Sequence, residues 1–410
     1  MTAHSAGNDR DRCPVGRDLE FDPLQPETFD SSHEVYERFR SECPVAHSEQ
    51  FGGFWALFKY QDVVDMASDH TTFTTTVQNV VPKISFTGRR PPLHFDPPEH
   101  KYYRRPLGGP LRSAQTSKLE GDMRSYARDL IAELRGKDSF DFATDFALPF
   151  AAHGFSRLLS LPDELVLRVR KLSVAYNFEV QAMNHVEVRR LSLELYDVAR
   201  EIVEGRKAEP LDSNADMVSG LLAACEAEVD PITEEMVVAS IRQMLVAAMA
   251  APHAVMSSAA VHLARDAQLH KRLREHTELI PAAVEEFLRL YSPYRVFSRT
   301  PVEDVAIGGR EITEGEPIAM IFPSANRDAD VFDDPHEFKL DRMPNQHIAF
   351  GVGVHTCPAA FFARMELRIA IEELVRGIEE FSLAGEVEMM NWLEFGPVSV
   401  PVRSTTRESA

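Results

Sequence analysis

One loop constrains the fold of this chain more than any other stretch: residues 349–371, which read AFGVGVHTCPAAFFARMELRIAI. Gly351 and Gly353 let the backbone turn tightly and pass close to a flat, bulky neighbour. Cys357 follows at the point where the loop becomes an apolar helix, whose N-terminus supplies positive potential and free N–H groups. We therefore expect a lowered thiol pKa, which suits Cys357 to bind a metal or to act as a nucleophile.

From these residues alone, several roles of Cys357 stay open. A free cysteine is usually a small core residue, so a purely structural role is the plain alternative. His355 is two positions away, which allows a Cys–His nucleophile pair, although neighbours in one turn rarely converge as nucleophile and base. A zinc site is disfavoured because no second Cys or His stands at ligand spacing around Cys357.

The composition is that of a globular protein with a large core, because 44% of the 410 residues are hydrophobic and 26% are charged. The formal net charge of −20 argues against nucleic acid or an anionic membrane as a partner. Four scattered cysteines give no disulfide framework. We find no signal peptide and no stretch near the roughly 18 apolar residues of a membrane span. The expectation is a soluble, cytoplasmic protein whose residues 1–18 are disordered.

The hydrophobic pattern predicts a mainly α fold. Helical spacing dominates residues 99–289, and residues 32–40 predict a short amphipathic helix near the start. Short β-like pieces lie near both ends of the chain, and residues 71–95 have no helical period. We find no linker or repeat, so residues 19–410 are expected to form a single domain, with a large helical part and small β-sheets.

Further motifs accompany the cysteine loop. Glu286 and Arg289 form an i,i+3 pair on one predicted helix, which alone is a common surface pattern. The segment SANRDADVFDDPHEFKLDR leads from a strand into a Pro- and Asp-rich meander that ends at Arg342. The segment DPPEHKYYRRPL starts a helix after two prolines, with His100 and Arg104 four positions apart. Each of these motifs alone is weak.

In this order, over residues 22–403, the motifs and the cysteine loop resemble the cytochrome P450 family, the haem-thiolate monooxygenases. The soluble bacterial type, to which camphor hydroxylase belongs, is the most similar. The family's loop, Phe-Gly-x-Gly-x-His-x-Cys-x-Gly, is matched by Phe350, Gly351, Gly353, His355 and Cys357. The sequence departs at Ala359, where the family usually has glycine, and the match resumes at Ala363.

The resemblance implies the cytochrome P450 fold and a haem b cofactor (Fe-protoporphyrin IX), with Cys357 as the axial thiolate of its iron. It implies that the haem contacts are His100, Arg104, Arg299, Phe350, Gly351, His355, Cys357 and Ala363. The basic members of this set would hold the haem propionates. Glu286, Arg289 and Arg342 resemble the family's buried charge triad, whose role is folding and haem retention.

The helix that activates oxygen departs from the family. Family members usually carry an acid and then an alcohol there, which deliver protons. Counting back from Glu286 in the register of camphor hydroxylase places Ala250 and Ala251 at these two positions. The candidate catalytic positions are therefore Ala250, Ala251, Pro252 and His253. Because Pro252 lacks an N–H, we expect the helix to open or kink and to expose carbonyls that hold water. His253 faces away from Ala251 at about 100° per residue, so a proton relay and a second-layer role both stay open.

Three kinds of chemistry are compatible with this departure. The first is a monooxygenase that hydroxylates or O-dealkylates a small hydrophobic or aromatic substrate, and we expect this one. The second is a peroxide-driven enzyme, and the third is non-hydroxylating haem chemistry. A haem protein that binds a ligand without turnover, as a carrier or sensor, is the alternative outside the enzymes.

The resemblance also implies a substrate pocket, whose candidate residues are Val80, Ile84, Phe86, Phe178, Ala248, Met249, Arg295, Val296 and Phe395. Most are apolar, which suits a small hydrophobic ligand. Arg295 is the exception, since its guanidinium group would pair with a carboxylate on the substrate. A propionate or solvent contact is the alternative for this residue.

Electrons are expected from a separate ferredoxin and ferredoxin reductase. The chain has no room for a fused reductase, and no Gly-rich dinucleotide motif follows a predicted strand. A basic patch for the ferredoxin is predicted on the cysteine side of the haem, although the chain as a whole carries a net negative charge. Its members would be Lys101, Arg104, Arg105, Arg364 and Arg368.

Overall fold

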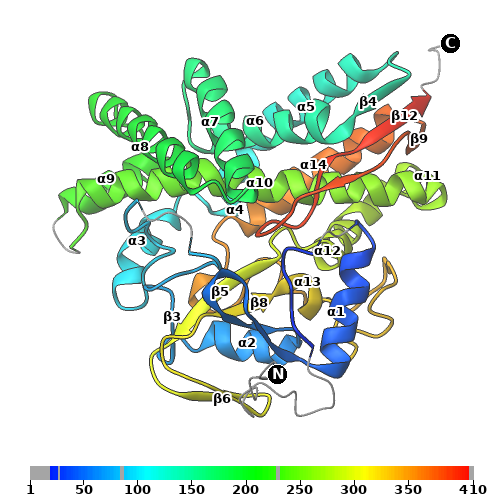
Figure 1. Cartoon of the computed structure of the whole chain (residues 1–410). Coiled ribbons are helices and arrows are strands. Elements are labelled where there is room, and N and C mark those ends of the chain that lie inside the picture. The colour runs from blue at the N-terminus through cyan, green and yellow to red at the C-terminus, as the bar shows by residue number, and fades with distance from the viewer. Residues whose placement is uncertain (1–18, 26–27, 84–86, 228–230, 406–410) are drawn as a thin grey trace.

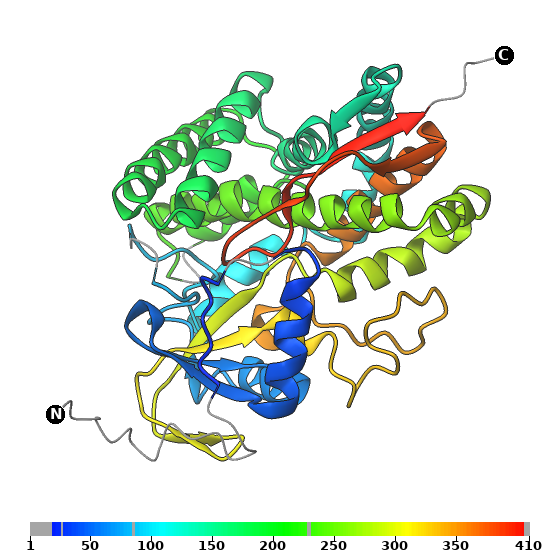
Figure 2. The same cartoon turned by 45° about the vertical axis from the view of Figure 1, so that its right-hand side comes forward.

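A helical region and a region built on a five-stranded sheet make up the molecule (Figures 1 and 2). The computed structural model describes residues 19–25, 28–83, 87–227 and 231–405. The segment predicted to be disordered, residues 1–18, lies outside the described residues. The mainly α fold with small sheets is confirmed.

The helices α3 to α12 fall within the predicted helical stretch 99–289 apart from one residue, α14 follows Cys357 as expected, and α1 covers the predicted residues 32–40. Their bounds are α1 (Ser31–Glu42), α2 (Tyr60–Ser68), α3 (Glu99–Leu107), α4 (Ser113–Thr116), α5 (Glu120–Leu134), α6 (Leu148–Leu158), α7 (Asp163–Gln181), α8 (His185–Ala208), α9 (Met217–Glu226), α10 (Glu234–Arg265), α11 (Ala267–Glu275), α12 (Ile280–Leu290), α13 (Phe322–Ala325) and α14 (Ala360–Gly377). Short 3₁₀ turns are η2 (Gln50–Gly52), η3 (Ser117–Leu119), η5 (Thr277–Leu279) and η6 (Gly353–His355), and η4 (Ala143–Ala147) is a π-helical turn.

Two of the sheets, the five-stranded and the three-stranded one, pair strands from the first half of the chain with strands from the second half. The largest has the order β1 (Val45–Ser48), β2 (Phe54–Leu57), β8 (Ile318–Ile321), β5 (Val296–Pro301), β3 (Phe73–Thr74). Within it β2 and β8 are parallel, and the other neighbours are antiparallel. The smaller sheets are β4 (Ser139–Asp141), β12 (Pro401–Thr405), β9 (Glu380–Leu383); β6 (Val305–Ile307), β7 (Arg310–Ile312); and β10 (Glu388–Met389), β11 (Pro397–Ser399).

Helix α10 is the central element, and it crosses the helical region from side to side in both views (Figures 1 and 2). Thr233 caps its first turn by accepting a hydrogen bond from the Met236 N–H at 3.3 Å. By length and apolar content α10 would suffice to cross a membrane, so the expectation that no stretch would do so was wrong. However, 67% of its apolar window is buried inside the protein, against α6, α7, α8, α9 and α14. It is the core helix of this fold.

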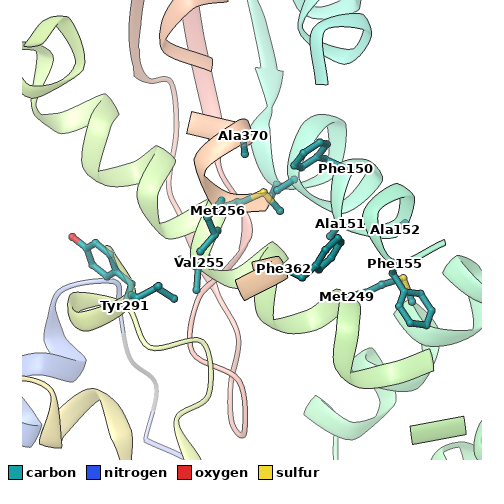
Figure 3. Packing of buried hydrophobic residues seen from close by; sticks show 14 of the residues in the cluster. Phe150, Ala151, Ala152, Phe155, Met249, Val255, Met256, Tyr291, Phe362 and Ala370 are labelled. Carbon is teal, nitrogen blue, oxygen red and sulfur yellow. The ribbon is translucent and has the colours of Figure 1, made fainter. Parts of the chain in front are cut away.

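The main hydrophobic core surrounds α10. Figure 3 shows part of it, where Met249 of α10 and Phe155 of α6 lie with Phe362 of α14. A second, smaller core fills the space between α2 and the large sheet. The cavity described next lies between these two regions, since residues of both line it.

Candidate active site

The cysteine loop folds as its glycines predict. Gly351 and Gly353 both have φ of +71°, a conformation that side chains other than glycine rarely adopt. A Cβ on Gly353 would lie 2.5 Å from the Ala67 carbonyl oxygen at the end of α2, so the loop also needs glycine for this close approach. The Cys357 N–H donates to the Phe350 carbonyl at 2.8 Å and closes the loop just before α14.

Cys357 lines a cavity of about 380 Å³ between the cysteine loop, α10 and the large sheet. Burial raises the pKa of its thiol, although the Ala359 N–H, Arg104 and Arg364 act in the opposite direction. The expected net lowering of this pKa was therefore wrong for the polypeptide alone, because burial outweighs the helix N-terminus. A bound metal ion deprotonates a coordinating thiol outright, so this site suits a metal-bound cysteine better than a free nucleophile.

Four basic side chains predicted to hold propionates meet in this cavity: His100 and Arg104 of α3, Arg299 of β5, and His355 of the loop. The His100 and His355 rings lie 4.7 Å apart, and the Nε2 atom of each is buried without a hydrogen-bond partner. His355 Nε2 is 3.7 Å from Asp96 Oδ1, beyond hydrogen-bond distance. Burial lowers the pKa of Arg299 to about 10, with Asp96 opposing, so the guanidinium remains charged at neutral pH.

These contacts fit a flat prosthetic group that carries carboxylates and a metal ion. Each unpartnered buried nitrogen needs a polar partner, because a buried donor or acceptor without one costs about 1–3 kcal/mol. Phe350, Gly351 and Ala363 also line the cavity, as predicted. Behind Phe350, the Arg364 guanidinium lies 4.5 Å from the ring centroid and forms two hydrogen bonds with Glu285, at 2.7 and 2.8 Å.

The cavity face of α10 includes two of the four candidate catalytic positions. Ala251 and Pro252 line the cavity, together with Ala247, Ala248 and Val255 one turn away on either side. The α-helix continues through Pro252 without interruption. The local change is one missing hydrogen bond, since Pro252 cannot donate to the Ala248 carbonyl.

Ala250 and His253 lie outside the cavity, which corrects their listing among the catalytic positions. Both are buried on other faces of α10, as the 100° spacing requires. Burial lowers the pKa of His253 to about 4, against the opposing effect of Asp141, so the ring is neutral at pH 7. The second-layer interpretation of His253 is the one that its position supports.

The predicted substrate pocket is correct for only part of its residues. Val80, Ala248 and Val296 line the cavity. Ile84 and Phe86 lie outside the described residues. The pocket assignment was wrong for Phe178, Met249, Arg295 and Phe395: Phe178 is 68% exposed on α7, and the other three are buried away from the cavity.

Arg295 is held in the core by aromatic residues. One Nη group donates to the Tyr36 hydroxyl, and the guanidinium lies 5.1 Å from the Phe395 ring centroid and 5.8 Å from that of Trp392. Stacking on aromatic faces compensates part of the cost of burying its charge. The predicted substrate contact by Arg295 was therefore wrong.

Sequence reasoning missed most of the polar lining. The missed residues are Tyr176, Asn177, Ser240, Gln243 and Glu394, whereas Asn79, Arg90 and Tyr294 lie in the segments 71–95 and 294–297 that the family resemblance assigns to the pocket. Burial raises the pKa of Glu394 to about 7, although Gln181 donates to its Oε2 at 2.5 Å and acts in the opposite direction. Ser240 and Gln243 were detectable, because they repeat at helical spacing before Ala247 and Ala251.

The charge triad is buried, as expected. Glu286 accepts hydrogen bonds from Arg289 at 2.7 and 2.9 Å and from Arg342 at 3.0 Å. It also accepts from the Lys339 N–H at 2.9 Å and the Asn345 amide at 3.0 Å. The carboxylate thus fastens the meander after α13 to α12.

Only two of the five residues predicted to form the basic patch are exposed, because the other three are half-buried and bonded to groups of the protein itself. Lys101 and Arg105 are exposed on α3, while Arg104 donates to the Thr356 carbonyl at 2.5 Å inside the site. Arg364 pairs with Glu285, and Arg368 pairs with Glu120 and Glu372.

Comparison with known proteins places these features in a family. A family model described as Cytochrome P450 matches residues 185–391, just over half of the chain. The curated protein "Putative cytochrome P450 YjiB" of Bacillus subtilis (strain 168) is 28% identical over 376 residues, which cover 90% of this chain and 92% of that protein. "Cytochrome P450-terp" of Pseudomonas sp. is 28% identical over 417 residues, covering 93% and 96%. The solved structure of cytochrome P450 CYP109Q5 from Chondromyces apiculatus has a TM-score of 0.84 at 25% identity, covering 95% of this chain and 99% of that one.

Proposed function

Since the chain belongs to the cytochrome P450 family and is a monooxygenase of that family, we propose that it inserts one oxygen atom from dioxygen into a small, largely apolar substrate. Hydroxylation and O-dealkylation are the two reactions in view. One observation carries this proposal: a half-buried thiol and four basic side chains, two of them with unpartnered nitrogens, meet in a single, mainly apolar cavity.

The cofactor we propose is haem b. Cys357 would bind its iron, and His100, Arg104, Arg299 and His355 would hold its propionates. When bound, this group supplies oxygen activation, which an axial thiolate favours. Gly351 and Gly353 would let the loop backbone pass close to the flat ring.

The residues of α10 would then organise water and substrate. The Ala248 carbonyl lacks the N–H that a residue other than proline would supply at position 252, so it is free to accept a hydrogen bond from water or a substrate hydroxyl. We propose that this acceptor takes over part of the ordering of protons that an alcohol at position 251 would provide. The apolar side chains around it, including Val255 and Val296, exclude further water.

The partners we propose are a separate ferredoxin and ferredoxin reductase. Lys101 and Arg105 on α3 are exposed beside the cysteine loop and would meet the acidic ferredoxin. For the chain as a whole, we propose a single domain over residues 19–410 and a cytoplasmic location, supported by the net charge of −20 and by the burial of α10.

Spectra of the reduced, carbon monoxide-bound protein test the cofactor assignment. We expect the Soret band of a thiolate-ligated haem in the wild type and its loss in Cys357→Ser. Cys225→Ser is the matched control, because Cys225 lies outside the cavity. A Cys357→Ser variant that keeps the wild-type band would overturn the assignment.

Turnover tests the reaction class. We expect oxidised product with ferredoxin, ferredoxin reductase, NAD(P)H and dioxygen. The missing acid and alcohol at Ala250 and Ala251 favour one second candidate, a peroxide-driven enzyme. Product with hydrogen peroxide, but none with the ferredoxin system, would support that candidate instead.

A further inference from the structure

Two arginines beside the cavity lack a carboxylate partner. Arg242 of α10 is fully buried; its Nη2 donates to the Ser192 hydroxyl at 2.8 Å, while its Nε and Nη1 have no hydrogen-bond partner. Arg90 lines the cavity, and its Nη2 lies 3.3 Å from His94 Nε2. Across the described residues, neither guanidinium forms an ion pair with an Asp or Glu. A fully buried guanidinium (Arg242) and a half-buried one (Arg90) without a counter-charge are costly, which marks the place as built for an anion.

The groups that contact these arginines are aromatic and imidazole rings and a hydroxyl, not carboxylates. Arg242 lies 4.7 Å from the Tyr176 ring centroid and 5.8 Å from that of Tyr196. Burial alone would raise the pKa of Tyr176, but Arg242 and Arg90 together lower it. Burial and then Arg90 and Arg242 lower the pKa of His94 to about 3, so its ring remains neutral. The local potential is therefore positive.

Neutral hydrogen-bonding groups complete this wall of the cavity. Gln243 follows Arg242 on α10 and lines the cavity, and its buried Oε1 has no partner. Asn177, next to Tyr176 on α7, also lines it. The two acidic side chains of the cavity differ in their surroundings: Glu394 accepts a hydrogen bond from Gln181, and burial raises the pKa of Glu366 well above its usual range.

We propose that Arg90, supported from behind by Arg242, binds a carboxylate group of the substrate. Planar guanidinium groups match carboxylates with two parallel hydrogen bonds, and such bonds are strongest away from water. Arg90 would touch the ligand, whereas Arg242 acts as a positioning residue through Tyr176 and its own charge. This inference rests on the proposed function, because it names the substrate class of the same cavity: small acids with an apolar body.

Ligand pairs that differ only in charge test the proposal. The probes are 3-phenylpropanoate and 3-phenylpropanamide, 2-naphthoate and 2-naphthamide, and decanoate and decanamide. Binding to the haem-loaded protein is measured by isothermal titration calorimetry and by the spin-state shift of the Soret band. We expect at least one acid to bind ten- to a hundredfold more tightly than its amide.

Variants locate the effect. Arg90→Gln should weaken binding of that acid ten- to a hundredfold and leave its amide within twofold. Arg89→Gln is the matched control, because Arg89 is exposed, lies outside the cavity and should change neither ligand. If Arg90→Gln fails to retain haem, Arg242→Gln replaces it in the same comparison, with a smaller loss expected for the acid alone.

The outcomes separate this inference from the proposed function. The inference is overturned if no acid binds more tightly than its amide, or if the arginine variant weakens both ligands equally. Product formation with the ferredoxin system is scored on the same ligands. A protein that oxidises the amides without preferring the acids keeps the proposed function and loses this inference. A protein that binds the acids selectively but oxidises none of the ligands keeps this inference and loses the proposed function.

Discussion

In the register that the family resemblance implies, Ala251 is the residue at which this cavity would depart most from its family. Its methyl group lines the cavity at the position where that register expects an alcohol, and Pro252 beside it removes a helix hydrogen bond from the Ala248 carbonyl. The chain therefore offers a backbone acceptor but no hydroxyl donor from position 251. Ordering of protons would depend on water or on the substrate itself.

Restoring the hydroxyl tests that dependence. In Ala251→Thr, we expect about a three- to tenfold rise in product formed per NAD(P)H consumed, below the roughly hundredfold of a fully placed acid. Product and NAD(P)H are quantified together. Ala250→Ser is the control, since position 250 lies outside the cavity and its hydroxyl should change nothing. An unchanged ratio in Ala251→Thr means that the alanine was not limiting.

Gly353 makes a second prediction for a single residue. Gly353→Ala should lower the free energy of unfolding by the roughly 1–2 kcal/mol of a side chain at positive φ. A further 1–3 kcal/mol should follow from overpacking, because the new Cβ would meet the Ala67 carbonyl. Gly315→Ala isolates the first term, since φ there is +87° with nothing within 4 Å. Equal losses in urea unfolding would show that the close approach costs nothing.

Single residues were predictable from sequence where a motif fixes them and not where only packing does. Cys357 and His355 occupy the cavity because loop spacing dictates it. Arg295 was assigned to the substrate, yet it is buried against Tyr36 and Phe395, while Arg90 lines the cavity instead. A charge in a sequence does not reveal which neighbours will surround it, because those neighbours come from distant elements.

At the scale of elements, helix α12 and the meander after α13 are held together by the Glu286 carboxylate and by Arg289, which donates to the Pro335 and Glu337 carbonyls at 2.7 and 2.9 Å. Glu286 receives hydrogen bonds from two arginines, a backbone N–H and an amide. The chain folds back across this point just before the cysteine loop. Stability of the cluster and retention of the haem should therefore be linked.

Glu286→Gln should lower the free energy of unfolding by about 3–5 kcal/mol, because it leaves Arg289 buried without a counter-charge. Haem content should fall in parallel. Urea unfolding and haem absorbance measure the two effects. Glu337→Gln serves as control in the same meander: its exposed side chain should change stability by no more than about 0.5 kcal/mol. A similar loss in both variants would contradict the special role of Glu286.

The sequence predicted where helices and strands lie better than it predicted which of their side chains face the core, the cavity or solvent. The α10 residues that line the cavity follow one helical stripe, so Met249 was predictable as a core residue (Figure 3). Phe178 differs, because a large apolar residue in a helix gave no sign that it would be 68% exposed. The pairing of β2 with β8 was also invisible, since nothing local links residues so far apart in sequence.

At the scale of the whole molecule, buried neutral histidines couple stability to pH. His270 of α11 is an example away from the cavity: it is 3% exposed, and burial and then Arg274 lower its pKa to about 4. The unfolded chain binds this proton near pH 6.5, before the folded one does. Stability from this residue is therefore present above pH 6.5 and is lost as the pH falls toward 4.

His270→Leu isolates this contribution. Between pH 6 and pH 5 the wild type should lose about 1 kcal/mol more unfolding free energy than the variant, the value of nearly one proton over one pH unit. Urea unfolding at the two pH values measures the difference. His276→Leu on the same side of the protein is the control, because His276 is exposed. Parallel pH dependence of wild type and His270→Leu would contradict the prediction.

The length of helix α10 between Arg242 and Ala251 sets a distance along the cavity. Nine positions separate Arg242 from Ala251, which is about 13 Å along the axis at 1.5 Å per residue. A substrate held by its acid group at the arginine end would thus present its opposite end to the haem. Molecular length, more than the intrinsic reactivity of each C–H bond, would then select the carbon that is oxidised. We expect regioselectivity for positions remote from the carboxylate, and product analysis on acids of increasing chain length would measure it.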